Sequence, residues 1–358
     1  MMGGVSVVED AEPATLAGFD AVIDTRTPKE FAQDHVPGAI NLPVLSNEER
    51  AEVGTIYMQE SRFKARRVGG AYVARNVARH LETAMAEWPA DFRPLVYCWR
   101  GGMRSNAMAV ILSQVGWRTG VLKGGYRTYR RRVSAQLYEQ KRELRVVLLE
   151  GPTGAGKTEV LQRLAARGVQ TIDLEHLAQH RGSLFGALPG QSQPSQKMFE
   201  SRLLAVIETL DAAAPVVVEA ESSKVGELNV PPLLWQAMGA APRIELQAPP
   251  ADRAAYLAAA YGDSLGDAET LAEILRRLPD RPGRGRIGAW LDLAAQGEHA
   301  ALAEALIETH YDPAYRRSAR RSETPILRTI SLASLDGQGF DRAAETIASL
   351  LADTGSRA

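Results

Sequence analysis

The chain has 358 residues, which is enough for two domains of ordinary size. Its 42 lysine and arginine residues nearly balance its 43 aspartates and glutamates, so overall charge does not attract it to nucleic acid, and any such binding depends on local patches. Its single cysteine excludes an internal disulfide and a structural metal site made of cysteines.

The N-terminus carries no recognisable targeting signal. Residues 1–16 lack the basic region and the sustained apolar region that a secretion signal needs. No later segment approaches the roughly 20 apolar residues of a membrane helix. We therefore expect a cytoplasmic protein with no membrane partner.

Residues 1–137 are predicted to form a first α/β domain. In chain order the pattern predicts a strand at 21–24, a helix from Pro28 capped by Thr27, a long helix at about 73–88, and strands at 94–97 and 117–122. Strands that alternate with helices indicate a parallel sheet.

Cys98 lies between the strand at 94–97 and a helix that begins near Ser105. The loop between them contains Trp99, Arg100, Gly101, Gly102 and Arg104. The backbone amides of such a loop attract negative charge, and nearby cations lower the pKa of a thiol. A lone cysteine is more often a small buried apolar residue, but this setting favours a reactive thiolate. Any persulfide or perselenide on Cys98 would pass its cargo to another molecule, because the chain has no second cysteine.

Several short segments of this first domain are informative through their order and spacing. They are Asp24-Thr25-Arg26, Glu30-Phe31, His35-Val36-Pro37-Gly38-Ala39 with Asn41, the loop from Cys98 to Ser105, and Leu122 to Tyr126. Together they resemble rhodanese domains, in which the loop cysteine carries a transferable chalcogen atom. We interpret Asp24, Arg26 and His35 as scaffold, an internal ion pair and a turn cap that brace the sheet.

Residues 138–358 are predicted to form a second domain, which begins with a strand at 145–150. The next eight residues, 151–158, read Gly-Pro-Thr-Gly-Ala-Gly-Lys-Thr, which is the pattern G-x-x-x-x-G-K-S/T between a strand and a helix. The glycines at 151, 154 and 156 would let the backbone wrap phosphate oxygens. Lys157 would supply a positive charge, and the Thr158 hydroxyl would reach a Mg²⁺ ion.

Acidic residues end the next two predicted strands, at 169–174 and 215–221. Asp173 ends the first, while Glu219 and Glu221 end the second, where P-loop enzymes place a metal-supporting acid. The glutamates would orient a metal-bound water, or would be satisfied by the polar residues that follow them. The polar stretch at 180–197, which includes Arg181, predicts a long loop that closes over the phosphate site.

An arginine-rich helical insertion is predicted at about 250–321, followed by a strand and a helix within 326–351. Its expected helices cover 253–261, 268–278, 287–296 and 298–310. The basic and aromatic residues among them are Arg276, Arg277, Arg281, Arg284, Arg286, Tyr315, Arg316, Arg317, Arg320 and Arg321. Such residues suit an RNA backbone and its bases, but charged helix faces are more often only solvated. The run Arg130-Arg131-Arg132 carries the same two interpretations.

Four further segments extend the likeness to the whole chain. They are 173–178 with 180–183, 193–200, 219–226, and His310-Tyr311-Asp312-Pro313. Together with a rhodanese-like domain followed by a P-loop domain, they resemble the tRNA 2-selenouridine synthases.

This resemblance implies a two-step change at the wobble 2-thiouridine of tRNA. A geranyl group from geranyl diphosphate is placed on the sulfur, and selenium from selenophosphate then replaces the geranylated sulfur. The P-loop would bind the diphosphate, and Cys98 would either carry selenium covalently or only position selenophosphate. The implied partners are tRNA and an enzyme that supplies selenophosphate, and no tightly bound cofactor is expected. The alternative is a rhodanese-type sulfurtransferase fused to an ATP-dependent small-molecule kinase.

Overall fold

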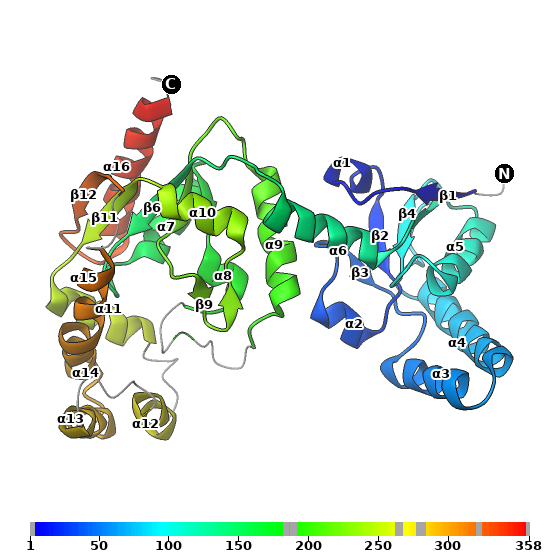
Figure 1. The fold of residues 1–358 in the computed structure, drawn as a ribbon, viewed down its shortest axis with the longest axis horizontal. Helices are drawn as coiled ribbons and strands as arrows, with labels where there is room; N and C mark the ends of the chain where they lie inside the picture. The colour runs from blue at the N-terminus through cyan, green and yellow to red at the C-terminus, as the bar shows by residue number, and fades with distance from the viewer. Residues whose placement is uncertain are drawn as a thin grey trace. The chain divides into compact units, whose positions relative to one another are not determined.

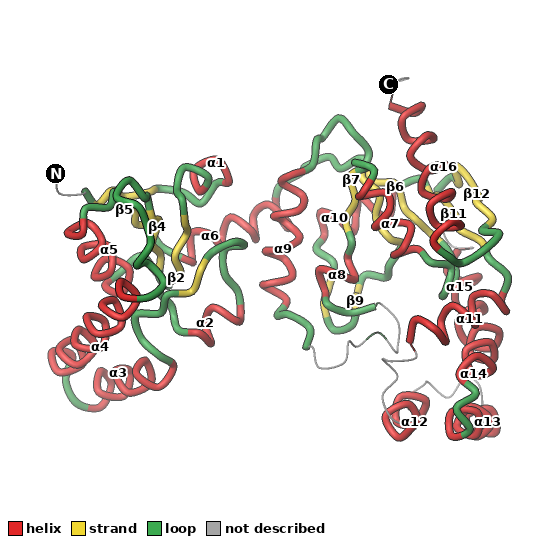
Figure 2. Tube along the Cα trace, turned by 180° about the vertical axis from the view of Figure 1, so that it is seen from behind, coloured by secondary structure: helices red, strands yellow, loops and turns green. Residues whose placement is uncertain are grey.

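The computed structural model describes residues 4–181, 186, 192–261, 268–276, 284–319 and 324–355. It divides into two compact units, one of Met1–Gln140 with Ser195–Ala205, the other of Lys141–Pro194 with Val206–Ala358. Each unit is built on a five-stranded parallel sheet with helices outside it (Figures 1 and 2). The predicted α/β class is therefore confirmed, whereas the predicted boundary after residue 137 stays a prediction.

The sheet of the first unit places Cys98 at the end of its central strand. The strand order is β1 (Val5–Val8), β5 (Thr119–Leu122), β4 (Pro94–Tyr97), β2 (Ala21–Asp24) and β3 (Ile40–Asn41), all parallel. All four residues of β4 are buried. Ligands of open α/β sheets bind at the carboxyl ends of the strands, which is where Cys98 follows Tyr97.

The helices of the first unit differ in part from those predicted. They are α1 (Pro13–Leu16), α2 (Pro28–Gln33), α3 (Asn47–Gln59), α4 (Arg62–Glu82), α5 (Met103–Val115) and α6 (Tyr126–Ser134), which continues as a π-helix at Ala135–Glu139. The predicted cap of α2 is confirmed, since Thr27 forms a capping box with Glu30. The prediction of a helix at 73–88 was wrong at both ends, because the Ser61 side chain caps α4 and the residues after Glu82 form turns around the buried Met85.

The predicted loop at 180–197 ends in helix α9 (Gln196–Thr209), which begins in the first unit, and residues 182–185 and 187–191 of that loop lie outside the described residues. Ser201 donates a hydrogen bond of 2.7 Å to the buried Asp34, and Glu200 forms an ion pair with Arg130. Arg132 is likewise paired, with Glu12 at 2.8 Å. Two arginines of the basic run in α6, Arg130 and Arg132, therefore form internal ion pairs, whereas Arg131 is exposed.

The second unit also has a fully parallel sheet. Its strand order is β12 (Ile326–Ser331), β11 (Arg243–Gln247), β6 (Val146–Glu150), β8 (Val216–Glu219) and β7 (Gln170–Ile172), and a short antiparallel pair, β9 (Lys224–Val225) and β10 (Leu228–Asn229), lies apart from it. Strand β11 was not predicted. Because β6 lies between β8 and β11, the loop after β6 emerges from the middle of the sheet.

The helices of the second unit include the predicted ones. They are α7 (Lys157–Ala166), α8 (Leu174–Ala178), α10 (Pro232–Ala240), α11 (Pro250–Tyr261), α12 (Ala268–Arg276), α13 (Arg284–Ala295), α14 (His299–Leu306), a π-helix at Ile307–Tyr311, α15 (Asp312–Ala319) and α16 (Gly337–Gly355). Of these, α10 and α15 were not predicted. Arg277, Arg281, Arg320 and Arg321 of the predicted basic cluster lie outside the described residues. Within the described ranges, no helix is long and apolar enough to cross a membrane.

Candidate active sites

Hydrogen bonds to sulfur surround Cys98, which is 3% exposed. The Gly102 amide and the Ser105 hydroxyl each donate to the Cys98 Sγ atom over 3.2 Å. Gly102 is the residue before the first turn of α5, so the sulfur lies at the N-terminus of that helix. The predicted loop therefore places its amides around the sulfur, as an anion site requires.

Two glycines allow the Cys98 loop to pack against the turn after β5. Gly101 has φ +63°, and a Cβ atom there would lie 2.7 Å from the Leu122 carbonyl oxygen. Gly125 has φ +57°, and its Cβ atom would lie 2.2 Å from the Cys98 carbonyl oxygen. That carbonyl instead accepts a hydrogen bond of 2.8 Å from the Tyr126 amide. The glycine-aromatic segment at the end of this domain thus holds the loop in place.

Burial and hydrogen bonding act in opposite directions on Cys98. Burial raises the pKa of the thiol, but hydrogen bonds from the Ser105 side chain and from nearby backbone amides outweigh it, and the pKa falls below its usual value. Hydrogen bonds, rather than the arginine charges predicted from sequence, are the main factors that favour the thiolate.

The arginines near Cys98 have separate roles. The Arg104 guanidinium makes two hydrogen bonds to the Glu30 carboxylate, at 2.8 and 3.3 Å, so its charge is largely matched. Arg100 is exposed. Both line a cavity of about 460 Å³ beside Cys98, together with Trp99 and with Arg50 of α3, which was not among the residues predicted from sequence to lie at this loop.

The residues interpreted as scaffold lie beneath this loop. Asp24 and Arg26 form a fully buried ion pair of 2.6 Å, which confirms that prediction. The Arg26 guanidinium also stacks over the Tyr126 ring at 4.0 Å, and Tyr126 in turn contacts Trp99. His35 lies against Phe31 and its Nδ1 atom is 2.8 Å from the Phe31 carbonyl oxygen.

The P-loop joins β6 to α7. Gly154 and Gly156 have φ values of +82° and +74°, and a Cβ atom on Gly156 would lie 2.2 Å from the Phe340 ring. Gly151 is close-packed too, since its Cβ atom would lie 2.9 Å from the Leu246 carbonyl oxygen. Lys157 donates to the Gly151 carbonyl at 3.3 Å, which folds its side chain over the loop. This backbone has the close turns that a phosphate cradle needs.

Three glutamates meet beside the P-loop. One carboxylate oxygen from each of Glu175, Glu219 and Glu221 lies within 4.8 Å of the others. The Thr158 hydroxyl donates to Glu175 over 3.3 Å. Glu219 and Glu221 were predicted from sequence, whereas Glu175 was not, and it reaches the cluster from the first turn of α8. Asp173 caps that helix by accepting a hydrogen bond of 2.8 Å from the His176 amide, while Arg181 follows α8 and donates its amide to Gly186.

This cluster fits a divalent cation. Glu219 is fully buried, and neither of its carboxylate oxygens accepts a hydrogen bond of normal geometry from a described residue. Burial and the neighbouring carboxylates raise the pKa of Glu175, and burial raises the pKa of Glu219 and of Glu221, although Lys157 opposes the shift in each case. Oxygen ligands of this kind suit Mg²⁺, and the glutamates with Thr158 would hold it.

The raised pKa values predict how stability depends on pH. Because the folded protein binds these protons more tightly than the unfolded chain, the contribution of the three glutamates to stability is greatest below about pH 4.5 and falls as pH rises toward the raised pKa values. Glu219→Gln should flatten this fall and stabilise the protein near pH 8 by about 1.4 kcal/mol for each pKa unit removed. Thermal unfolding from about pH 5 to 8 without divalent cations measures it. If the stability of the wild type and of Glu219→Gln changed with pH in the same way, the raised pKa of Glu219 would be contradicted.

A buried arginine of the helical region contacts the P-loop. Arg253 of α11 makes two hydrogen bonds to the Asp312 carboxylate, at 2.9 and 2.8 Å, and donates to the Thr153 carbonyl at 3.0 Å. Arg253 is 2% exposed. The segment that includes Asp312 therefore supports the P-loop backbone through Arg253.

Together, the two sites define an α/β enzyme that joins a cysteine loop of the rhodanese type to a P-loop domain. Residues 11–132 match the family model "Rhodanese-like domain", and residues 144–281 match "tRNA 2-selenouridine synthase AAA domain". The tRNA 2-selenouridine synthase of Chromohalobacter salexigens is 34% identical over 332 residues, which cover 84% of this chain and 88% of that protein. Those of Pseudomonas syringae pv. syringae and Cupriavidus pinatubonensis are 34% and 33% identical, over 82% and 84% of this chain and 87% and 90% of theirs.

The chain belongs to the tRNA 2-selenouridine synthase family. This membership decides between the two activities predicted from sequence, and the fusion of a sulfurtransferase with a small-molecule kinase is set aside.

Proposed function

We propose that this enzyme converts the 2-thiouridine at the wobble position of tRNA to 2-selenouridine through an S-geranyl intermediate. Its substrates are then tRNA, geranyl diphosphate and selenophosphate, and an enzyme that makes selenophosphate is a further partner. The observation that carries the proposal is the presence of two anion sites in one chain, the P-loop at 151–158 and the loop at Cys98, each at the carboxyl end of a parallel sheet.

The first step suits the P-loop. The thiouridine sulfur forms a bond to C1 of the geranyl group, the C1–O bond to diphosphate breaks, and the ring proton goes to solvent. Negative charge grows on the departing diphosphate, and the loop amides with Lys157 would stabilise it. A Mg²⁺ ion held by Thr158 and the glutamates would supply further positive charge there. Hydrolysis of ATP is not needed.

The second step suits the loop at Cys98. Selenium of selenophosphate forms a bond to C2 of the uridine, the C2–S bond breaks, and the geranyl chain departs as geranylthiol. Water then cleaves the Se–P bond and releases phosphate, and the base regains its ring proton. No atom changes oxidation state in this sequence. Arg50 and Arg100, which line the cavity beside Cys98, would hold the anionic donor.

The oxidation states also bear on the role of Cys98. A covalent Cys98–Se bond requires two electrons to leave sulfur and selenium, and phosphorus cannot accept them if it departs as phosphate. We therefore favour the other role, in which Cys98 positions selenophosphate. The thiolate would accept the Se–H proton during attack on C2 and return it to the departing geranyl thiolate.

Mass spectrometry of nucleosides tests the proposal. Thiolated tRNA incubated with the protein and geranyl diphosphate should yield S-geranyl-2-thiouridine, and addition of selenophosphate should yield 2-selenouridine. Unchanged wobble nucleosides, together with ATP-dependent phosphorylation of a small molecule, would overturn it. After incubation with selenophosphate alone, the intact protein should show no added selenium mass if Cys98 only positions the donor.

A further inference from the structure

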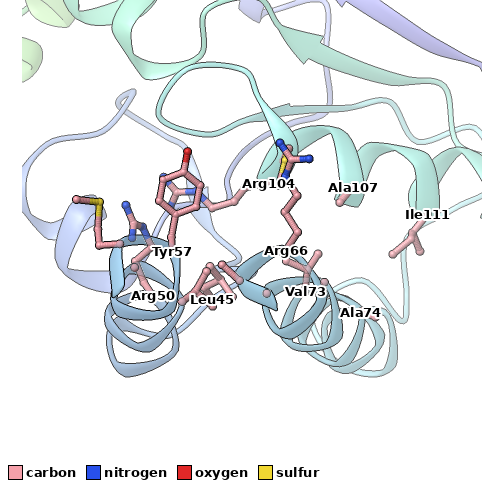
Figure 3. Close-up of a pocket in the computed structure, with 16 residues that line it drawn as sticks. Leu45, Arg50, Tyr57, Arg66, Val73, Ala74, Arg104, Ala107 and Ile111 are labelled. Carbon is pink, nitrogen blue, oxygen red and sulfur yellow. The ribbon is translucent and has the colours of Figure 1, made fainter. Parts of the chain in front are cut away.

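A groove of about 710 Å³ lies between three helices of the first unit, α3, α4 and α5 (Figure 3). Its volume is within the range of ligand-binding cavities, about 300–1,000 Å³. Most of its lining is apolar, with side chains such as Val53, Val73 and Ile111. Figure 3 shows Tyr57, Val73 and Ile111 among the side chains that line the groove, on α3, α4 and α5 in turn.

The groove adjoins the cavity at Cys98. Arg50, Met103 and Arg104 line both spaces. The polar groups of the groove are mainly guanidinium groups, Arg66 on α4 and the two shared arginines. An extended molecule in the groove could therefore place a hydrocarbon part among the helices and a polar or anionic end beside Cys98.

Large apolar side chains remain exposed along the groove. Met58, Met103 and Tyr57 are 81%, 65% and 46% exposed, and all three line it. Exposed apolar surface that forms one contiguous patch marks a binding site more often than scattered apolar residues do. Flexible methionines adapt to irregular hydrocarbon ligands.

We propose that this groove binds the prenyl chain of the S-geranyl intermediate while C2 of the modified base faces Cys98. The inference rests on the proposed function and identifies how the second site would recognise its substrate. A branched ten-carbon chain attached to the base must enter the site at Cys98 together with that base. In the groove the geranyl chain would make apolar contacts that begin beside Cys98. Outside the groove the chain would remain exposed to water.

Burial of the chain should make the second step selective for a long S-alkyl group. Each buried methylene contributes about a fourfold preference. Burial of only three or four carbon atoms would therefore favour S-geranyl over S-methyl tRNA by about 100-fold in kcat/KM. A site that recognised only the base and the tRNA would convert both substrates at similar rates.

Gly70 offers a variant that fills the groove without threatening the fold. It lies inside α4 and lines the groove, and a Cβ atom there would have no neighbour within 4 Å. Leucine is also a better helix former than glycine. Gly239→Leu is a matched control, since Gly239 is an exposed glycine in α10 of the second unit that also has no neighbour within 4 Å.

The test compares chemically prepared S-geranyl and S-methyl 2-thiouridine tRNA as substrates with selenophosphate. Gly70→Leu should lower kcat/KM for the S-geranyl substrate about tenfold, leave the S-methyl substrate within about twofold, and so reduce the selectivity. Gly239→Leu should match the wild type. An equal loss for both substrates, as expected if the groove binds RNA, would overturn the inference, and so would no loss at all, as expected if it binds a protein partner.

Binding of the free nucleoside separates this inference from the proposed function. Equilibrium dialysis should show that S-geranyl-2-thiouridine binds the wild type more tightly than it binds Gly70→Leu, whether or not chemistry follows. If the wild type converts S-geranyl tRNA but binds S-geranyl-2-thiouridine and S-methyl-2-thiouridine with equal affinity, only the assignment of the groove fails. If it binds the geranyl nucleoside through the groove yet never forms 2-selenouridine, the proposed function fails and the groove remains a site for prenyl chains.

Discussion

Lys157→Ala is expected to slow geranyl transfer by about 100-fold or more, because it removes the ammonium group that folds over the P-loop. The diphosphate that departs from C1 carries more negative charge in the transition state than in the bound substrate, so the loss falls mainly on kcat. The measurement is the initial rate at which S-geranyl-2-thiouridine forms from thiolated tRNA at saturating geranyl diphosphate.

The control for Lys157 bypasses the first step. When tRNA that already carries the S-geranyl group is supplied, Lys157→Ala should form 2-selenouridine at about the wild-type rate. Lys157→Arg retains the charge but differs in shape and hydrogen-bond geometry, and it should restore only part of the first step. Equal loss of both steps in Lys157→Ala would show that the two reactions do not divide between the two units.

Both loops that hold the candidate sites could be predicted because each is continuous in sequence. The P-loop at 151–158 combines glycines, Lys157 and Thr158 between a strand and a helix, and this order alone specifies the backbone turns. The loop at Cys98 is similar, since its amides and Ser105 lie within seven positions of the sulfur. The parallel sheets followed from the alternation of strands and helices.

The groups that complete these sites come from distant parts of the chain. Glu175 joins Glu219 and Glu221 only because β7 pairs with β8, and no local pattern near Glu175 indicates this pairing. Glu30 meets Arg104 across 74 positions. The groove depends on α3. Ile56 is the buried residue of this helix, so the apolar periodicity of its sequence is too weak to predict a helix there.

The path of α9 could not be predicted for a related reason. Its polar N-terminal residues have the composition of a surface loop. Within α9, Ser201 bonds to Asp34, which lies 167 positions away, and Glu200 bonds to Arg130, which lies 70 positions away. A buried carboxylate that accepts hydrogen bonds from Ser201 and Tyr126 stabilises this packing, yet each residue alone reads as an ordinary polar side chain.

Cys98→Ala is expected to abolish selenium incorporation while geranyl transfer remains near the wild-type rate. The Cys98 sulfur accepts hydrogen bonds from the Gly102 amide and the Ser105 hydroxyl, and alanine removes this acceptor, although the Ser105 hydroxyl keeps the Gly102 carbonyl oxygen within 3.1 Å. S-geranyl-2-thiouridine should therefore accumulate in tRNA when both small substrates are present. The measurement is the ratio of S-geranyl to seleno nucleoside, with Ser113→Ala on the same helix as a variant remote from the sulfur.

Ser105→Ala tests whether the thiolate, and not the side-chain volume of Cys98, is what the second step needs. Loss of the hydroxyl raises the pKa of Cys98, because the Ser105 hydrogen bond is the largest factor that lowers it. The acid limb of the rate of selenium incorporation should then move to higher pH, while the rate on the alkaline plateau recovers much of the wild-type value. If the rate fell but the acid limb of the pH profile stayed at the wild-type pH, Ser105 would have a purely structural role. The thiol form of Cys98 would then be the active one.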